Sequence, residues 1–229
     1  MWYQTPGESM KLSLILAQAR TGELAGLSAV DKTDEKIVGY INLGLIALYN
    51  RFQLSTEEAI ITLRPDIPKN IYTMNSTDPD VKVNNAAMAD DEFMSIIAAY
   101  DSAGEEIPIN DDNNPYSVFT VSYNQVQVPL LVDDGYISII YRKNPKLVTY
   151  VDNGSGAATE ADVPLPVQFL EPLLHYIGYR AHGAVDGNVQ AENSTHYTRY
   201  MAACNALEVA GVLTADDTIS APVWAKGFV

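Results

Sequence analysis

The first quarter of the chain contains two stretches in which apolar residues recur every three or four positions. The shorter stretch, Ser9–Arg20, is predicted to be a helix that stops at Gly22. The longer stretch, Asp34–Phe52, is predicted to be a helix capped by Asp34. Its apolar stripe consists of Ile37, Ile41, Leu45, Leu48 and Phe52. Both helices therefore have one apolar side that must be buried.

Two glycines interrupt the second predicted helix. Gly39 and Gly44 each cost about 1 kcal/mol relative to alanine in a helix interior. A glycine in a helix interior can allow another helix to approach closely. It can also be present without any such role. We expect a close helix–helix contact near these positions.

Between residues 55 and 150 the helical spacing disappears. Short runs of β-branched and aromatic residues follow one another, separated by prolines and turn sequences. Hairpin turns are predicted at 101–104 and 133–135. The predicted strands are Ala59–Leu63, Phe93–Tyr100, Glu105–Ile109, Tyr116–Tyr123, Gln125–Val132, Tyr136–Tyr141 and Leu147–Tyr150. We expect the tyrosines of these strands to fill the core of the sheet.

Helical spacing returns after a loop of small residues, Asp152–Asp162. In the helix that follows, Pro166 suits the first turn and Arg180 the last turn. Pro172 predicts either a kink or the true start of this helix. The apolar side of the helix contains Phe169, Leu170, Leu173, Leu174 and Ile177.

The last predicted helix is capped by Asn193 or Ser194. Its predicted buried stripe consists of Tyr197, Tyr200, Met201, Cys204 and Leu207. The final two helices thus form a hairpin between Val163 and Gly211. A tail without periodicity follows it.

Neither the first nor the last pair of helices can bury its apolar side alone. We therefore predict an α+β fold in which residues 1–54 and 151–213 form one discontinuous helical bundle. Residues 55–150 are then a central inserted β-rich region, and residues 214–229 are a C-terminal tail. The content of 47% apolar and 19% charged residues is typical of a globular chain.

The charge of the chain restricts its partners. It has 29 acidic and 14 basic residues, which give a formal net charge of −15. Such a surface repels phosphate backbones and anionic membranes. A channel through which DNA passes without binding fits this charge, and so does ordinary solubility. The sequence shows no signal-peptide pattern and no apolar run long enough to cross a membrane.

No catalytic or cofactor signature emerges from the sequence. His175, His182 and His196 are dispersed and are predicted to be structural, so we expect no zinc site. Cys204, the single cysteine, is predicted to fill the core, and the chain to be made in a reducing compartment. The acidic turns lack the calcium-loop pattern, and their aspartates are expected to cap backbone groups. We expect no enzymatic activity, no cofactor and no metal.

Aromatic residues are the stronger candidates for function. Tyr176 and Tyr179 lie three residues apart, on a side of their helix turned away from its apolar stripe. This pair could face outward or contact a partner, because tyrosine is favoured at interfaces. Tyr197 and Tyr200 lie on the apolar stripe of the last helix and are weaker candidates.

Three motifs in the last third of the chain resemble a known family. They are Val163-Pro164-Leu165-Pro166, Tyr179-Arg180-Ala181 and the tyrosine-rich segment Ser194–Leu207. Together they resemble the C-terminal half of the head-to-tail adaptors of tailed phages, a connector family that includes proteins like tail tubular protein A. The helix Asp34–Phe52 followed by the strand Ala59–Leu63 fits the same pattern. The β-rich region is larger than a minimal adaptor needs.

The resemblance implies a structural protein of the virion neck, assembled in the host cytoplasm. Copies would form a ring, expected to be a dodecamer, that links the portal protein to the tail tube or nozzle protein. DNA would pass through the channel as cargo during genome ejection, and no membrane would be involved. Trp224 and Phe228 would anchor the tail on the portal, or else pack on the bundle. The candidate partner-binding residues are Tyr176, Tyr179, Arg180, Tyr197, Tyr200, Trp224 and Phe228.

Two other functions remain open from the sequence. The acidic turns and aromatic strands suit a carbohydrate- or calcium-binding β module on a helical stalk, as in host-recognition proteins. An enzyme of unrecognised type is the third possibility, which no motif in the sequence supports.

Overall fold

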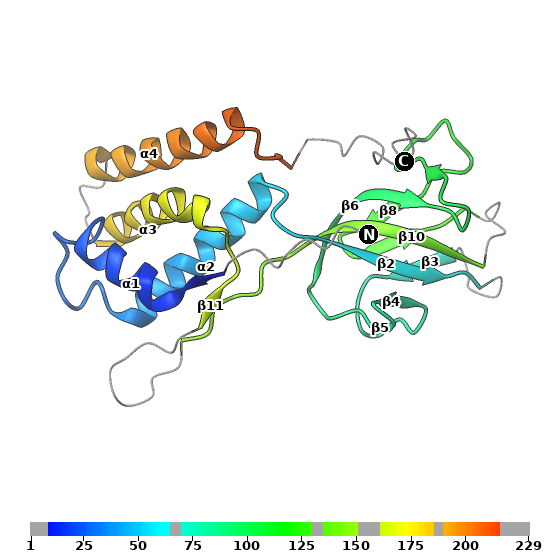
Figure 1. Ribbon diagram of the computed structural model, residues 1–229, viewed down its shortest axis with the longest axis horizontal. Coiled ribbons are helices and arrows are strands. Elements are labelled where there is room, and N and C mark those ends of the chain that lie inside the picture. Colours follow the sequence, from blue (N-terminus) through cyan, green and yellow to red (C-terminus); the bar gives the residue numbers. More distant parts are fainter. Residues whose placement is uncertain (1–8, 65–69, 130–134, 151–160, 186–189, 216–229) are drawn as a thin grey trace, which may run out of the picture. The chain divides into compact units, whose positions relative to one another are not determined.

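The computed structural model describes residues 9–64, 70–129, 135–150, 161–185 and 190–215, and it confirms mixed α+β structure. In these residues the chain forms four α-helices and three sheets (Figure 1). The described residues divide into two compact units. A helical unit contains those within 9–52 and 145–215, and a β unit contains those within 53–144. None of the described helices has the length and hydrophobicity of a membrane span.

The helical unit is built around its third helix. Helix α3 (Leu170–Val185), which follows a short 3-10 turn, packs against α1 (Leu12–Thr21), α2 (Asp34–Arg51) and α4 (Gln190–Val209). A two-stranded sheet joins β1 (Met10–Lys11) to β11 (Asp162–Val163). The apolar sides of the helices meet in a common core that includes Leu12, Ile15, Leu16, Ile37, Ile41, Leu45, Leu48, Phe52, Phe169, Leu173, Ile177 and Cys204.

The helix ends differ from several predictions. Helix α1 begins at Leu12, because Met10 and Lys11 pair with β11. Thr33 precedes α2 as its N-cap residue, so Asp34 lies in the first turn. Helix α3 continues past Arg180, and α4 begins at Gln190, before both predicted caps. Propensity alone sets such ends poorly, since pairing and packing move them by several residues.

Pro172 marks the start of a helix and does not interrupt one. It is the third residue of α3, in the first turn. Backbone N–H groups in the first turn have no partner within the helix, so a proline costs little there. The structure therefore confirms the second of the two readings of this residue.

The two glycines of α2 have different environments. A Cβ atom added at Gly44 would lie 2.6 Å from Leu173 Cδ1 and 3.3 Å from Tyr176 Cδ1. A Cβ atom added at Gly39 would meet nothing within 4 Å. The predicted close helix contact is therefore confirmed at Gly44, where α3 crosses, and is wrong at Gly39.

The Val-Pro-Leu-Pro motif fastens the start of the last helical pair to α2. Val163 and Leu165 are fully buried, and the Tyr49 hydroxyl donates a hydrogen bond of 2.7 Å to the carbonyl oxygen of Pro164. Beyond the motif, the Phe169 ring packs edge-to-face on Phe52, with ring centroids 5.1 Å apart. The motif is thus a structural joint within the helical unit.

The predicted strand Leu147–Tyr150 is wrong. The backbone of Val148 is bound instead by the Asn42 side chain of α2, which donates to its carbonyl oxygen at 2.9 Å and accepts from its N–H at 2.8 Å. This amide replaces a neighbouring strand, so the segment is extended without belonging to a sheet.

The β unit contains a six-stranded and a three-stranded antiparallel sheet that share one core. The larger sheet has the order β5 (Ala86–Ala87), β4 (Val81–Val83), β2 (Thr56–Thr62), β10 (Tyr136–Lys143), β6 (Phe93–Tyr100) and β7 (Glu106–Ile107). The smaller has the order β3 (Ile71–Thr73), β9 (Gln125–Gln127) and β8 (Phe119–Ser122). The long strands meet at Ile139, whose partners are Ala59 and Ala99.

One predicted hairpin is confirmed and one is wrong. Strands β6 and β7 pair across a turn in which Asp101 accepts backbone hydrogen bonds and Gly104 has a φ of +83°. Strands β9 and β10 were expected to pair across 133–135, but β9 pairs with β3 and β8 while β10 pairs with β2 and β6. Successive strands therefore lie in different sheets, a separation that local turn chemistry does not encode.

Candidate assembly surface

Four tyrosines interlock the last two helices. The Tyr176 ring packs against Tyr200 with centroids 5.2 Å apart, and the Tyr179 ring packs against Tyr197 at 5.1 Å. Tyr176 and Tyr179 also contact each other at 5.8 Å. Pairs spaced three residues apart on each helix lie on one side of it, so the two pairs can meet as a ladder. We call these four residues the tyrosine ladder.

The ladder residues differ in their exposure. Tyr200 is 5% exposed, and burial raises the pKa of its hydroxyl well above the ordinary value, which keeps the side chain neutral. Tyr197 is 45% exposed, so its predicted place in a buried stripe is wrong. Tyr176 and Tyr179 are half-buried. The side of α3 that seemed free for a partner is therefore covered in part by α4 of the same chain.

The Tyr-Arg-Ala motif presents one residue to solvent. Ala181 is fully buried, and Tyr179 belongs to the ladder. Arg180 is exposed, with its guanidinium carbon 6.0 Å from the centre of the Tyr179 ring. Among the candidate residues in the described part of the chain, Arg180 and Tyr197 are those most accessible to another molecule. Trp224 and Phe228 lie outside the described residues.

A second joint holds the end of α4 on the end of α2. Arg51 donates a hydrogen bond of 2.8 Å to Glu208 and one of 2.5 Å to Asn205. Its backbone carbonyl oxygen accepts the N–H of Ala215 at 2.8 Å, next to a bridge between Phe52 and Thr214. The chain is therefore fixed as far as Ala215.

A shallow groove of about 390 Å³ runs between α3 and α4. Small residues on α4 leave the groove unfilled, and polar side chains border the groove. Its lining residues are Gln168, Glu171, Pro172, His175, Arg199, Ala202, Ala203, Ala206 and Leu207.

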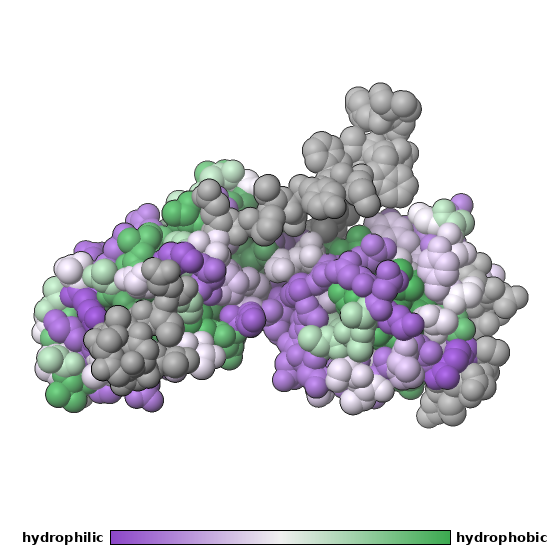
Figure 2. Space-filling model, turned by 60° about the horizontal axis from the view of Figure 1, so that its bottom comes forward, coloured by the Kyte–Doolittle hydropathy of each residue, from purple (hydrophilic) through white to green (hydrophobic). Residues whose placement is uncertain are grey.

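Three large side chains in and next to β8 are exposed in the β unit, which the sequence did not predict. Tyr116 is 53% exposed, Val121 45% and Tyr123 81%, although the tyrosines were expected to fill the core. Val121 lies on β8, at the edge of the smaller sheet, and Tyr123 lies in the turn to β9. We call these three residues the β8 edge patch. Figure 2 shows apolar residues reaching the surface of both units, interspersed with hydrophilic ones.

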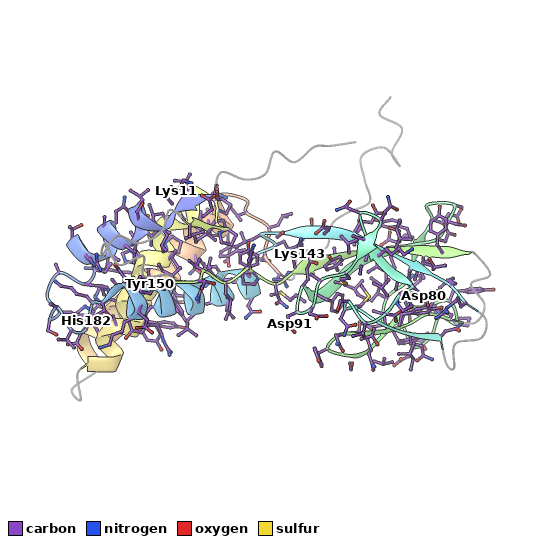
Figure 3. All side chains as sticks on the ribbon, turned by 90° about the horizontal axis from the view of Figure 1, so that it is seen from below. Lys11, Asp80, Asp91, Lys143, Tyr150 and His182 are labelled. Atoms are coloured by element: carbon purple, nitrogen blue, oxygen red, sulfur yellow. The ribbon has the colours of Figure 1, made fainter. Side chains whose placement is uncertain are left out.

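Most of the negative charge belongs to the β unit. Residues 53–144 contain 15 acidic and 5 basic residues, which account for −10 of the net −15. Lys143 of β10 is shared between two of the acids, Glu57 and Glu92 (Figure 3). The remaining charge makes this unit strongly acidic.

The acidic turns act as caps, as expected. Asp78 accepts the N–H groups of Thr73 and Asp80, and Asp101 accepts those of Ala103 and Glu105. Asp111 accepts the N–H of Asn113 in the same manner. These carboxylates satisfy turn backbones, which weakens the case for a calcium-binding module.

The histidines, by contrast, are not dispersed. His175 and His182 of α3 and His196 of α4 converge on Glu23, in the turn after α1. The Glu23 carboxylate lies 3.0 Å from His175 Nδ1 and 2.7 Å from His196 Nδ1. The rings of His182 and His196 stack with centroids 4.8 Å apart. Figure 3 labels His182 in the helical unit. This cluster was not predicted from the sequence, because its members belong to three separate elements.

The histidine cluster is largely shielded from solvent. Burial lowers the pKa of His196, and the neighbouring Glu23 carboxylate acts in the opposite direction. The side chains of Glu23, His175 and His196 are each less than one-fifth exposed. The imidazoles are thus held near a carboxylate in a partly desolvated position.

The described residues form two structural joints and a tyrosine ladder. They also expose aromatic and cationic side chains. A comparison with family models matches residues 10–223 to the SU10 adaptor protein family. The comparison with curated proteins finds no match. The family match spans both units of the chain. The chain therefore belongs to the SU10 adaptor family, a family of phage head-to-tail adaptors, as the resemblance predicted.

Proposed function

We propose that the protein forms a ring in the neck of a tailed phage, between the portal and the tail tube or nozzle. The ring is expected to be twelvefold and to surround the channel through which DNA leaves the capsid. The observation that carries this proposal is the family match over residues 10–223. An adaptor needs rigid surfaces rather than reactive groups, and the described joints and ladder suit that need.

The helical unit is proposed to be one discontinuous domain, made of residues 1–54 and 151–213, with residues 55–150 inserted. Contacts of α3 with α1, α2 and α4 support this organisation. The Asn42–Val148 and Tyr49–Pro164 hydrogen bonds hold the returning chain on α2. An insertion anchored in this way can vary in size without disturbing the bundle.

Contacts between neighbouring copies are proposed to use Arg180 and Tyr197. These two residues lie on α3 and α4, and both are exposed. Tyrosine and arginine are enriched where protein surfaces bind each other, because each combines a large contact area with hydrogen-bonding groups. The buried Tyr200 then has the role of fixing the surface on which Tyr197 is presented.

The acidic β unit is proposed to keep DNA from binding during its passage. A surface with 15 acidic and 5 basic residues repels phosphate groups. Repulsion of this kind falls off within about 10 Å at 0.1 M salt, so it acts only on DNA that comes close.

Mass measurement of the purified chain, alone and mixed with its portal ring, tests the proposal. We expect a complex with a fixed number of chains per portal. Variants that leave the proposed contact residues between copies unchanged should give the same number. Absence of any portal-dependent assembly over a range of salt and protein concentrations would contradict the adaptor function.

The tail is proposed to contribute an arm that docks on the portal, with Trp224 and Phe228 as apolar anchors. Removing residues 216–229 tests this arm while keeping Thr214 and Ala215, which contact the end of α2. The truncated chain should fold normally and bind the portal at least about tenfold more weakly, since apolar anchors carry much of an interface's energy. Equal binding by the truncated and full chains would refute the arm.

A further inference from the structure

We infer that the helical unit binds one divalent transition-metal ion, preferentially Zn²⁺, between Glu23, His175 and His196. Each of these residues offers one ligand atom, and the three atoms all lie within 4.8 Å of one another. They come from the turn after α1, from α3 and from α4. The ion would therefore join three elements that are distant in the sequence, and the inference does not depend on the proposed function.

The distances suit a tetrahedral ion after small side-chain adjustments. Nitrogen and oxygen ligands lie about 2.0–2.2 Å from zinc, which places two ligand atoms about 3.4 Å apart. Glu23 lies 3.0 Å from His175 Nδ1 and 2.7 Å from His196 Nδ1. The two carboxylate–imidazole distances have to lengthen by about 0.4 and 0.7 Å to reach this spacing. Rotation about the side-chain torsions allows this change.

The two nitrogens that face Glu23 lie at ion-pair distance from its carboxylate but form no well-aligned hydrogen bond with it. His175 Nδ1 and His196 Nδ1 are buried, and neither has a hydrogen bond of acceptable geometry despite the nearby carboxylate. Buried polar atoms are nearly always bonded, because leaving one without a partner costs free energy. A cation bound to all three groups satisfies both nitrogens and the carboxylate at once.

The groups around the three ligands resemble the outer shell of a metal site. A histidine that binds metal through one nitrogen usually meets a carboxylate or carbonyl with the other. Glu171 lies 3.7 Å from His175 Nε2, one helical turn earlier on α3. The His182 ring stacks on His196 and has its Nε2 3.0 Å from the Glu23 carbonyl oxygen. Stacking on His182 restricts the orientation of the His196 ring, and Glu171 is within reach of the second nitrogen of His175.

Gly178 makes room for the cluster on α3. A Cβ atom added there would lie 2.8 Å from His196 Nδ1 and 3.2 Å from Glu23 Cβ. The absence of a side chain at this position lets a ligand from α4 and one from the α1 turn approach α3 together. A glycine in the middle of a helix costs about 1 kcal/mol, and here it has a specific use.

The types of ligand favour zinc. Two imidazole nitrogens and one carboxylate form a donor set that zinc accepts, with a fourth position left for water or a further group. Of the three ligands, His175 also lines the groove between α3 and α4. A site with three protein ligands on three elements would clamp α4 onto the rest of the helical unit.

Metal binding by the tag-free full-length chain tests the inference. After removal of metals with a chelator, Co²⁺ and then Zn²⁺ are added, and binding is followed by the visible absorption of Co²⁺ and its loss on displacement by Zn²⁺. We expect one ion per chain, tetrahedral-type Co²⁺ absorption and a higher melting temperature with Zn²⁺, by mass action. Failure of the wild-type chain to bind either ion at micromolar concentration would overturn the inference.

Matched variants locate the site. His175→Ala combined with His196→Ala should weaken Zn²⁺ binding more than about 100-fold, and Glu23→Gln more than about tenfold, because they remove ligands. Glu35→Gln changes an exposed carboxylate in the same unit and should leave the affinity within about twofold. Undiminished binding by the folded double variant, checked by circular dichroism, would overturn the assignment. If that variant does not fold, the Glu23→Gln and Glu35→Gln pair decides the question.

Discussion

At the scale of single residues, small side chains determine how closely the helices approach. Gly44 lies under Leu173 and Tyr176, whereas Gly39 on the same helix faces open space. The sequence predicted a close contact on this helix but could not distinguish the two glycines. Their spacing of five residues places them on different sides of α2, and only the partner helix reveals which side is covered.

The two glycines provide a matched test of packing. Gly39→Ala should raise the free energy of unfolding by about 1 kcal/mol, because alanine is the better helix former and meets no neighbour. Gly44→Ala should lower it by about 1 kcal/mol, since the gain in propensity is outweighed by displacement of the buried Leu173. Denaturant unfolding followed by circular dichroism measures both values. Equal stabilisation by the two variants would show that α3 does not approach α2 as described.

At the scale of elements, the tyrosine ladder explains why α4 stays on α3. The stripe of α4 is weakly apolar, with Tyr200 and Cys204 buried while Tyr197 remains 45% exposed. Aromatic pairs offset this weakness, because ring contacts add about 0.5–1.5 kcal/mol each beyond the area that they bury. The spacing of the tyrosines was visible in the sequence, but their partners were not, since facing helices can be matched in several registers.

Truncating the two ladder tyrosines of α4 should lower the free energy of unfolding by unequal amounts. Tyr200→Ala should lower the free energy of unfolding by about 3 kcal/mol, because it leaves a cavity in the buried side of α4. Tyr197→Ala should lower it by less than about 1 kcal/mol, since nearly half of that side chain already contacts solvent. Thermal and denaturant unfolding of both variants measure the difference. Equal costs would contradict the packing of α4 described above.

The limits of sequence-based prediction also appear at the scale of elements. The long helix α2 and the strand β6 were predicted nearly to the residue. Helix α2 has a clear period over many positions, and β6 is an apolar run that ends at the turn 101–104. Strand pairing was predicted less well: β8, β9 and β10 follow one another closely, yet β10 belongs to another sheet. The histidine cluster was missed altogether, since the convergence of α3, α4 and the turn after α1 is a tertiary property.

At the scale of the whole molecule, the two units differ in the kind of surface they offer. The helical unit exposes Arg180 and Tyr197 above an interlocked pair of helices. The β unit is strongly acidic and exposes the aromatic β8 edge patch. The family match includes both units, so both belong to the adaptor architecture.

The β8 edge patch can be tested without disturbing the fold. Tyr123→Ser should change the free energy of unfolding by less than about 0.5 kcal/mol, because the side chain is 81% exposed. If the patch binds a tail component, the same variant should weaken that complex by about tenfold, as loss of an interface tyrosine does. Binding to tail proteins in a pull-down with quantified affinity measures the effect. Lys82→Ser, an exposed change on β4 in the same unit, is the control that should bind normally.

We propose that this protein is a ring-forming adaptor of the phage neck. Electron cryomicroscopy of the intact particle tests it most directly. We expect a ring of density between portal and tail into which the helical unit and the β unit both fit, with an open channel along the axis. A neck in which the portal contacts the tail directly, with this chain elsewhere in the particle or missing from it, would contradict the claim.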